Sequence, residues 1–257
     1  MQQFHSRSGV LRYHDLPGAG TPLLFIHGLG CASTSDFPRV AADPALSGRR
    51  RLLLDLLGAG LSDRPDDFAY TVTAHAETVA ALIRQLELPP LDVVGHSMGG
   101  AVAIAASSLC PSRIRQLLLL EPNLDGGGGR FSRAVAGMSE EDFVLRGQGR
   151  LARLASRDGS PMWAASLAAS HAIAVHRAAV SLLAGVEPGW RAQLYALDMP
   201  RNLVVGAASP MTENEQALLE HGVRLHRLAD AGHAMNEDNP SGLAALLATI
   251  LEQEYAD

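Results

Sequence analysis

The sequence predicts an α/β fold with a mostly parallel, doubly wound sheet and one helical insertion. Short apolar runs that stop at a glycine or a polar turn alternate with segments whose apolar residues recur at helical spacing. Continuous apolar runs are typical of strands buried on both faces of a parallel sheet. With 257 residues, 47% of them hydrophobic, the chain can form a single core. We expect this core to comprise residues 1–124 and 190–257, and a helical cap to comprise residues 125–189.

The first half of the chain predicts an antiparallel edge pair followed by three buried strands. Residues 1–16 alternate weakly between apolar and polar side chains, and a Pro-Gly-Ala-Gly turn follows them. The buried strands are expected at residues 23–26, 51–57 and 91–94. Segments long enough for crossover helices lie between these strands, at residues 33–47 and 72–86.

The second half predicts the helical insertion and the remainder of the sheet. A helix over residues 101–109 and a strand over 114–120 precede four consecutive glycines at 126–129. Residues 131–185 then contain no strand-like run, which predicts helices carried on a glycine hinge. Strands are expected again at residues 201–206 and 223–228, and helices at about 212–221 and 240–254.

Charge and composition exclude several classes of function. The net charge is −6, and all 21 basic residues are arginines. Without lysine, Schiff-base catalysis and a lysine-linked pyridoxal cofactor are excluded. The acidic balance argues against a nucleic-acid partner. No apolar run approaches the roughly 18 residues that would span a membrane, so no membrane partner is expected.

The cysteines and the N-terminal residues predict a cytoplasmic protein without a cofactor. Residues 1–7 lack the charged-then-apolar layout of a secretory signal. Cys31 and Cys110 are too few for a disulfide framework. Neither has C-x-x-C spacing and no H-E-x-x-H occurs, so we expect no metal. A monomer and a homodimer both remain open.

A glycine-flanked serine, Ser97, follows the third buried strand in a G-x-S-x-G pattern completed by Gly95 and Gly99. This pattern is that of a nucleophile elbow, a strained turn between a strand and a helix that exposes the serine hydroxyl. The N–H groups at the start of the following helix point to the same place and would stabilise an oxyanion there. An ordinary glycine-rich turn is the alternative, and the context decides between the two.

That context is a set of polar residues at one edge of the predicted sheet. Catalytic groups in parallel sheets gather beyond the carboxyl ends of the strands. Ser97, Glu121, His233 and the His27-Gly28 loop all fall at such ends. A serine hydroxyl needs a base within hydrogen-bond reach. We expect His233 to be this base because it directly follows the last strand and a glycine, and we expect His27 and His96 to brace their loops.

These motifs resemble those of the α/β-hydrolase superfamily over nearly the whole chain apart from the insertion. The matching segments are residues 27–30, 55–62 and 95–100, and Gly232-His233 with Glu237 and Pro240. The resemblance implies an α/β-hydrolase fold with the chain order nucleophile, acid, histidine. It also implies that Asp55 holds a turn rather than taking part in the chemistry.

The acid departs from the commoner family pattern. Many relatives carry an aspartate soon after the strand that ends here at Gly206, but residues 207–211 contain no carboxylate. Some relatives, including the zearalenone lactone hydrolases, place the acid after the preceding strand, where this chain has Glu121. The resemblance therefore implies that Glu121 orients His233. Asp125 and Glu213 remain alternatives.

The same motifs predict the groups that surround the substrate carbonyl. The oxyanion hole is expected to consist of the backbone N–H of Met98 and, by the resemblance, that of Leu29. Gly28 and Cys31 of the same loop are candidates for the pocket wall, and a small buried thiol is the alternative for Cys31.

The predicted cap supplies candidates for substrate contact. Its large apolar residues are Phe131, Val135, Met138, Phe143, Met162 and Trp163. We assign Phe131, Met162 and Trp163 to the pocket; the alternative is that such residues pack the cap onto the core. One helical face carries Arg146, Arg150, Arg153 and Arg157. That face either attracts a substrate carboxylate or is simply solvated.

The sequence thus predicts a cofactor-free serine hydrolase that cleaves a carboxylic ester or lactone of an apolar small molecule through an acyl-enzyme. Hydrolysis of a carbon–carbon bond in a diketone-type substrate is one alternative, because it needs the same three residues. A ligand receptor that kept the fold is another, because a fold does not fix a function.

Overall fold

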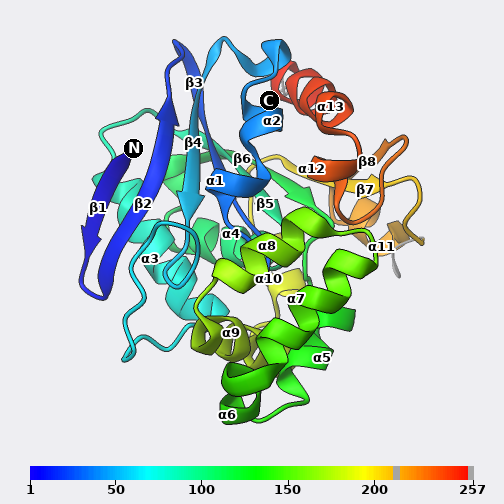
Figure 1. Cartoon of the computed structure of the whole chain (residues 1–257). Coiled ribbons are helices and arrows are strands. Elements are labelled where there is room, and N and C mark those ends of the chain that lie inside the picture. Colours follow the sequence, from blue (N-terminus) through cyan, green and yellow to red (C-terminus); the bar gives the residue numbers. More distant parts are fainter. Residues whose placement is uncertain (211–214, 254–257) are drawn as a thin grey trace.

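The computed structural model describes residues 1–210 and 215–253, which form one eight-stranded sheet flanked by helices (Figure 1). The strands are β1 (Gln2–Ser6), β2 (Gly9–Leu16), β3 (Gly20–Ile26), β4 (Arg49–Asp55), β5 (Leu91–His96), β6 (Ile114–Leu120), β7 (Arg201–Gly206) and β8 (Val223–Leu228). Their order is β1-β2-β4-β3-β5-β6-β7-β8. Only the β1-β2 and β2-β4 pairs are antiparallel. The predicted fold class and edge pair are therefore confirmed.

The central strands are apolar on both sides because helices cover both faces of the sheet. In β3, Leu24 and Ile26 face one core while Leu23 and Phe25 face the other, and all four are fully buried. The first core includes residues of α3 (Val72–Gln85), α4 (Met98–Leu109) and α10 (Trp190–Tyr195). The second includes residues of α2 (Pro38–Ala41) and α13 (Pro240–Glu252). Burial on both faces explains why these strands have no polar alternation.

Some boundaries differ from the prediction for local reasons. β4 ends at Asp55 rather than at residue 57, because the Leu56 N–H donates to His27 Nε2 (3.1 Å) and the chain turns away. Three short pieces replace the crossover helix expected at residues 33–47, namely α1 (Ser33–Asp36), α2 and the 3₁₀ turn η1 (Pro44–Leu46). Prolines begin both α2 and η1, where a continuous helix would need a backbone donor.

The helix expected at residues 212–221 is represented by α11 (Glu215–Glu220), and its first part lies outside the described residues. The last helix, α13, ends at Glu252, before the expected residue 254. A short helix, α12 (Met235–Asp238), precedes it and was not predicted.

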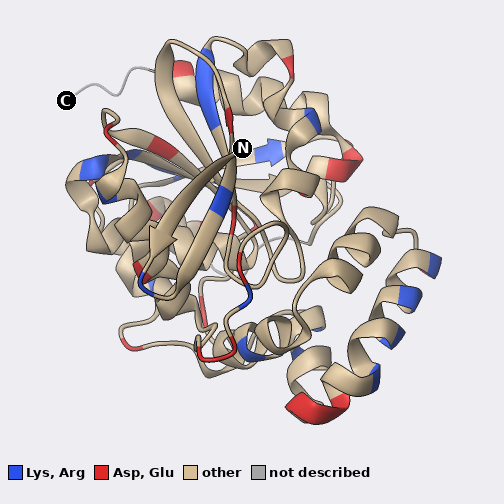
Figure 2. Cartoon of the chain, turned by 60° about the vertical axis from the view of Figure 1, so that its left-hand side comes forward, with Lys and Arg blue, Asp and Glu red and all other residues tan. Residues whose placement is uncertain are grey.

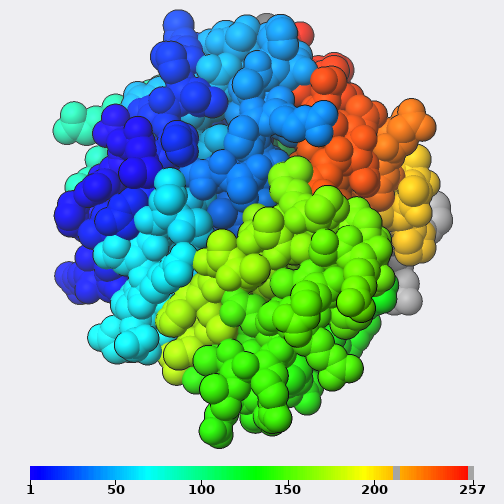
Figure 3. Space-filling model, viewed as in Figure 1, coloured from blue at the N-terminus to red at the C-terminus, as the bar shows by residue number. Residues whose placement is uncertain are grey.

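Between β6 and β7 the chain forms a layer of helices that we call the α5–α9 segment, residues 130–184. Its elements are α5 (Arg130–Ala136), α6 (Glu140–Asp142), the π-helical turn η3 (Phe143–Gly147), α7 (Gln148–Arg157), α8 (Pro161–Ala169) and α9 (Ala172–Ala184). Val135, Phe143 and Leu167 form part of a small core of its own. These helices gather at one end of the sheet in Figure 1 and cover that side of the molecule in Figure 3.

None of the described helices is by itself long and apolar enough to cross a membrane. Only α8 and α9 taken together reach the required length and composition, and a bend of 110° separates them.

Candidate active site

Ser97 lies in the sharp turn between β5 and α4. Its φ of 53° and ψ of −119° fall in a region that residues with a side chain rarely adopt. A Cβ at Gly95 would lie 2.5 Å from Gly99 O, and one at Gly99 would lie 2.4 Å from Ile26 O. Both flanking positions therefore require glycine. This is the strand–turn–helix geometry that the G-x-S-x-G pattern predicts.

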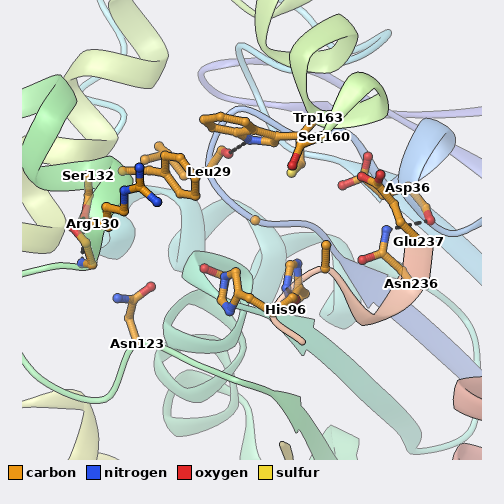
Figure 4. Close-up of a pocket in the computed structure, with 17 residues that line it drawn as sticks. Leu29, Asp36, His96, Asn123, Arg130, Ser132, Ser160, Trp163, Asn236 and Glu237 are labelled. Carbon is orange, nitrogen blue, oxygen red and sulfur yellow. Dashed lines mark hydrogen bonds between the residues drawn. The ribbon is translucent and has the colours of Figure 1, made fainter. Parts of the chain in front are cut away.

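A cavity of about 420 Å³ lies between the sheet and the α5–α9 segment, and Ser97 is part of its wall (Figure 4). The core also contributes Gly28 and His233. The α5–α9 segment contributes Phe131 and Trp163, whose ring centroids are 4.4 Å apart. The cavity thus combines polar groups from strand ends with aromatic groups from the helices.

His233 and Glu121 are joined by a short hydrogen bond beside this cavity. Nδ1–H of His233 donates to Glu121 Oε2 at 2.7 Å. The imidazole side chain is 49% exposed, whereas the Glu121 carboxylate is 15% exposed. No hydrogen bond joins Ser97 to His233 in this conformation of the described chain, which is common before a substrate tightens a site. The three predicted residues are nevertheless brought to one place.

The surroundings of Glu121 favour its charged form. The backbone N–H of Gly206 donates to Glu121 Oε1 at 2.9 Å. Burial raises the pKa of Glu121, but the hydrogen bonds from His233, Ser209 and Gly206 outweigh burial and lower that pKa to about 2. A carboxylate that is ionised at neutral pH and points at Nδ1 fixes the orientation of the ring and leaves Nε2 free for proton transfer.

Two further histidines brace the loops of the site, as predicted. His96 Nε2–H donates to the backbone carbonyl of His233 (2.9 Å), and the two rings lie 4.9 Å apart. Burial lowers the pKa of His96 to about 3, so this ring stays neutral. His27 Nδ1–H donates to Gly28 O (2.8 Å) while its Nε2 accepts from Leu56.

Asp125, one of the two alternative acids, does not meet His233 in the described chain. Asp125 instead forms an ion pair with Arg191, with 2.6 Å between Oδ2 and Nη2. Glu213 lies outside the described residues. Asp55 holds the turn as expected, because its carboxylate accepts from Thr34 Oγ1 (2.7 Å) and from the Leu61 N–H (2.9 Å).

The predicted oxyanion-hole amides are free donors. In the described part of the chain, the N–H groups of Leu29 and Met98 have no hydrogen-bond acceptor. Met98 is the first residue of α4, where backbone donors have no partner within the helix. Gly28 lies against the nucleophile loop, since a Cβ there would be 3.4 Å from Ser97 Cβ. This close approach brings the Leu29 loop next to Ser97.

Most of the predicted pocket residues line the cavity, and Met162 does not. Gly28, Cys31, Phe131 and Trp163 are part of its wall. Cys31 is also a buried thiol, and burial raises its pKa well above the ordinary value, so both interpretations of this residue apply. Neighbouring positions of a helix point about 100° apart. Trp163 of α8 is part of the cavity wall and Met162, one position before it, is not, so contact between Met162 and a substrate stays a prediction.

The arginine face of the insertion lies outside the cavity. Arg150 and Arg153 are exposed on α7, and Arg146 pairs with Asp142. Figure 2 shows basic positions, in blue, in a row along a helix at the outer edge of the helical layer. A solvated face is therefore the interpretation that the structure supports.

Sequence reasoning missed several polar residues of the cavity. Asp36, Asn236 and Glu237 line one end, whereas Asn123 and Arg130 line the other (Figure 4). Their backbone positions are on loops and short helices, so no strand-end rule points to them. For Glu237 the sequence did contain a signal, because this residue lies only four positions after His233, on α12. Among the described residues, no group of three or more His, Cys, Asp or Glu side chains could hold a metal ion.

Comparisons with known proteins agree with this fold. The chain is 36% identical over 108 residues to 2-hydroxy-6-oxo-2,4-heptadienoate hydrolase of Pseudomonas putida, and the match covers 42% of this chain and 39% of that protein. The chain therefore spans well under half the length of that relative.

Solved structures match over the full length at lower identity. An esterase from Thermogutta terrifontis has a TM-score of 0.82 and 21% identity, with 98% of each chain covered. The N-acyl homoserine lactonase AidH, complexed with N-butanoyl homoserine, has a TM-score of 0.77 and 21% identity, covering 100% of this chain and 99% of that one. At these identities the likeness shows the fold alone. The family model described as alpha/beta hydrolase fold matches residues 21–240, and this chain therefore belongs to the alpha/beta hydrolase fold family.

Proposed function

We propose that the protein is a serine hydrolase that cleaves a carboxylic ester or lactone of a small, largely apolar molecule. The observation that carries this proposal is the 2.7 Å hydrogen bond between Glu121 and His233 beside a strained, cavity-lining Ser97. A nucleophile, a base and a group that orients the base are the parts that acyl transfer requires.

The proposed reaction has two halves. Ser97 Oγ attacks the carbonyl carbon while His233 Nε2 takes the hydroxyl proton, and the N–H groups of Leu29 and Met98 stabilise the oxyanion. The tetrahedral intermediate collapses, the bond to the leaving alcohol oxygen breaks, and His233 returns the proton to that oxygen. Water then attacks the acyl-enzyme with His233 as base, which releases the acid and restores Ser97.

Glu121 contributes electrostatically in this scheme. Its low pKa keeps it ionised, so it stabilises the imidazolium that forms in each half-reaction without taking the proton itself. The neutral His96 ring holds the His233 backbone in place. Phe131 and Trp163 provide the apolar surface against which the substrate would pack.

Carbon–carbon bond hydrolysis is the second candidate. Two relatives favour it, 2-hydroxy-6-oxo-2,4-heptadienoate hydrolase of Pseudomonas putida and 2-hydroxymuconate semialdehyde hydrolase of Pseudomonas sp. strain CF600. The esterase and the lactonase with the same fold favour the ester and lactone assignment. Both reactions use the same three residues, so the substrate decides between them.

The first test is intact mass after treatment with a fluorophosphonate, followed by turnover of esters, lactones and diketones. We expect one adduct on the wild type and none on Ser97→Ala, with Ser156→Ala, an exposed serine of α7, as the matched control. Absence of an adduct on a folded sample would contradict the proposal. Tight binding of apolar ligands without turnover would then favour a receptor.

A further inference from the structure

One end of the cavity carries two carboxyl groups and the amide of an asparagine. Asp36 of α1 and Glu237 of α12 bring two carboxyl groups to this end, and Asn236 lies between them (Figure 4). Asp36 and Asn236 are 5% and 4% exposed, so both belong to the wall rather than to the surface. These residues come from opposite ends of the chain, and the fold places them together.

The amide of Asn236 has a defined direction. Its Nδ2 donates to the backbone carbonyl of Asp36 at 3.1 Å. A carbonyl only accepts hydrogen bonds, so this contact fixes the NH₂ on the side of α1 and the oxygen on the other side. Figure 4 shows that oxygen directed into the cavity. Among the described residues, the Asn236 side chain makes this one hydrogen bond through Nδ2 and none through Oδ1, although Asn236 is only 4% exposed.

The two carboxyl groups have no cationic partner in the described chain. Asp36 accepts only weak or neutral donors, from Ser35 Oγ (3.0 Å) and from the Cys31 thiol. None of the ion pairs among the described residues includes Asp36 or Glu237. Arg130, the arginine that lines the cavity, lies on the opposite side in Figure 4.

Unpaired carboxylates in such a place are unfavourable without a ligand. Burial and the neighbouring charges of Asp36 and Asp238 raise the pKa of Glu237, against a hydrogen bond from the backbone of Trp163 that lowers it. Burial also raises the pKa of Asp36 against the hydrogen bonds from Cys31 and Ser35. Buried charges are normally paired, and charge-assisted hydrogen bonds are among the strongest that a protein makes.

We propose that Asp36, Asn236 and Glu237 form a specificity subsite for a protonated amine carried by the substrate. The inference rests on the proposed function and narrows it to esters or lactones that bear an ammonium group away from the scissile carbonyl. An ammonium has three donors and no acceptor, which matches three converging acceptors. The aromatic pair of Phe131 and Trp163 would hold the apolar part between the carbonyl and the amine.

The test compares esters that differ only at the tip of the chain. One series of p-nitrophenyl esters carries an ammonium, a hydroxyl or a methyl at the end of the acyl chain, and a second series carries the same tips on the alcohol of butyrate esters. We expect the ammonium ester to have at least tenfold higher kcat/KM than its methyl counterpart in one series at pH 7. Glu237→Gln and Asp36→Asn should each reduce that ratio at least threefold, while Glu77→Gln, an exposed residue of α3, should not.

An inhibition measurement covers the case in which Asp36→Asn fails to fold. Hexylammonium should compete with a neutral ester for the wild type at least tenfold better than hexan-1-ol, and Glu237→Gln should remove the difference. Equal use of the ammonium and methyl tips together with equal inhibition would overturn the subsite. A hydroxyl tip that matches the ammonium would overturn the assignment to an amine.

The experiments distinguish failure of the amine subsite from failure of the proposed hydrolase function. Fluorophosphonate labelling of Ser97 without an ammonium preference would leave the hydrolase proposal standing and overturn the subsite. Thermal stabilisation of the wild type by hexylammonium, absent in Glu237→Gln, would support the subsite even if Ser97 were unreactive.

Discussion

The cavity has a floor and a roof that are built in different ways. The floor consists of Ser97 and His233, with Glu121 bonded behind His233. Two of these residues are bonded to neighbouring strands: Ser97 N–H donates to Leu120 O (2.9 Å), and Glu121 N–H donates to Val204 O (3.0 Å). Strand β6 therefore holds Ser97, which follows β5, and strand β7 holds Glu121, which follows β6. The rigidity of the sheet therefore passes directly to the chemical groups.

The roof, Phe131 and Trp163, is attached more loosely. It follows a glycine run in which Gly127 and Gly128 have positive φ, and Phe131 is 39% exposed. The indole of Trp163 donates a hydrogen bond from Nε1 to the backbone carbonyl of Leu29 (3.0 Å). From this difference we propose that the floor determines the reaction and the roof determines which substrates fit. The predictions below test that division.

Removal of the nucleophile should have the largest effect. Ser97→Ala is expected to lower kcat by about 10⁴-fold or more with the best ester found, because the covalent step is lost. The melting temperature should not fall, since alanine is smaller and the Gly95 and Gly99 turn is kept. Turnover by Ser97→Ala within tenfold of the wild type would contradict the role of the floor.

Neutralising the acid should have the next largest effect. Glu121→Gln is expected to lower kcat by about 10³-fold to 10⁴-fold, because His233 loses the charge that stabilises its imidazolium. Asp125→Asn, which breaks only the surface pair with Arg191, is the matched control and should stay within threefold of the wild type. Near-normal turnover by Glu121→Gln, with a loss in Glu213→Gln, would show that the acid is misassigned.

A roof substitution should change selectivity more than chemistry. Trp163→Ala is expected to raise KM for an aryl or long-chain ester by about tenfold while kcat for acetate esters changes little, because pocket contacts of this kind are worth about 1–3 kcal/mol. Met162→Ala, one position away on α8 and outside the cavity wall, is the control. If Trp163→Ala lost as much kcat as Glu121→Gln, the roof would take part in the chemistry and the proposed separation of roles would be wrong.

The smallest expected effect is a pH-dependent change in stability. The folded-state pKa of Glu121, about 2, lies below its ordinary value of 4.5, so its contacts stabilise the fold above about pH 4.5 and are lost as the pH falls toward 2. The contribution is at most about 3 kcal/mol. The difference in melting temperature between the wild type and Glu121→Gln should therefore shrink between pH 5 and pH 2. A difference that grows toward acid pH would have the wrong sign.

The sequence predicted the floor because two strong local rules apply there. Buried parallel strands have continuous apolar runs, and the groups that follow them share one edge of the sheet. The strained turn at Ser97 is specified by Gly95 and Gly99, which no other residue can replace without a clash. Glu121 needed the resemblance to a family, since periodicity alone does not distinguish it from Asp125.

The roof and the polar ends of the cavity were less predictable for physical reasons. The sequence identifies apolar residues in the insertion but does not show which of two neighbours faces the cavity, so it could not separate Trp163, which lines the wall, from Met162, which does not. Asp36 and Asn236 are 200 residues apart in sequence, and only the packing of α1 against α12 brings them into contact. Such contacts depend on the arrangement of the whole sheet.

A double-mutant cycle on Glu121→Gln and His233→Ala tests most directly whether the floor acts as one unit. If Glu121 works only through His233, the double variant should have the same kcat/KM, within about threefold, as His233→Ala alone. If all variants fold and the loss of kcat/KM in the double variant equals the product of the two single losses, the account is contradicted. Glu121 would then act on a group other than His233.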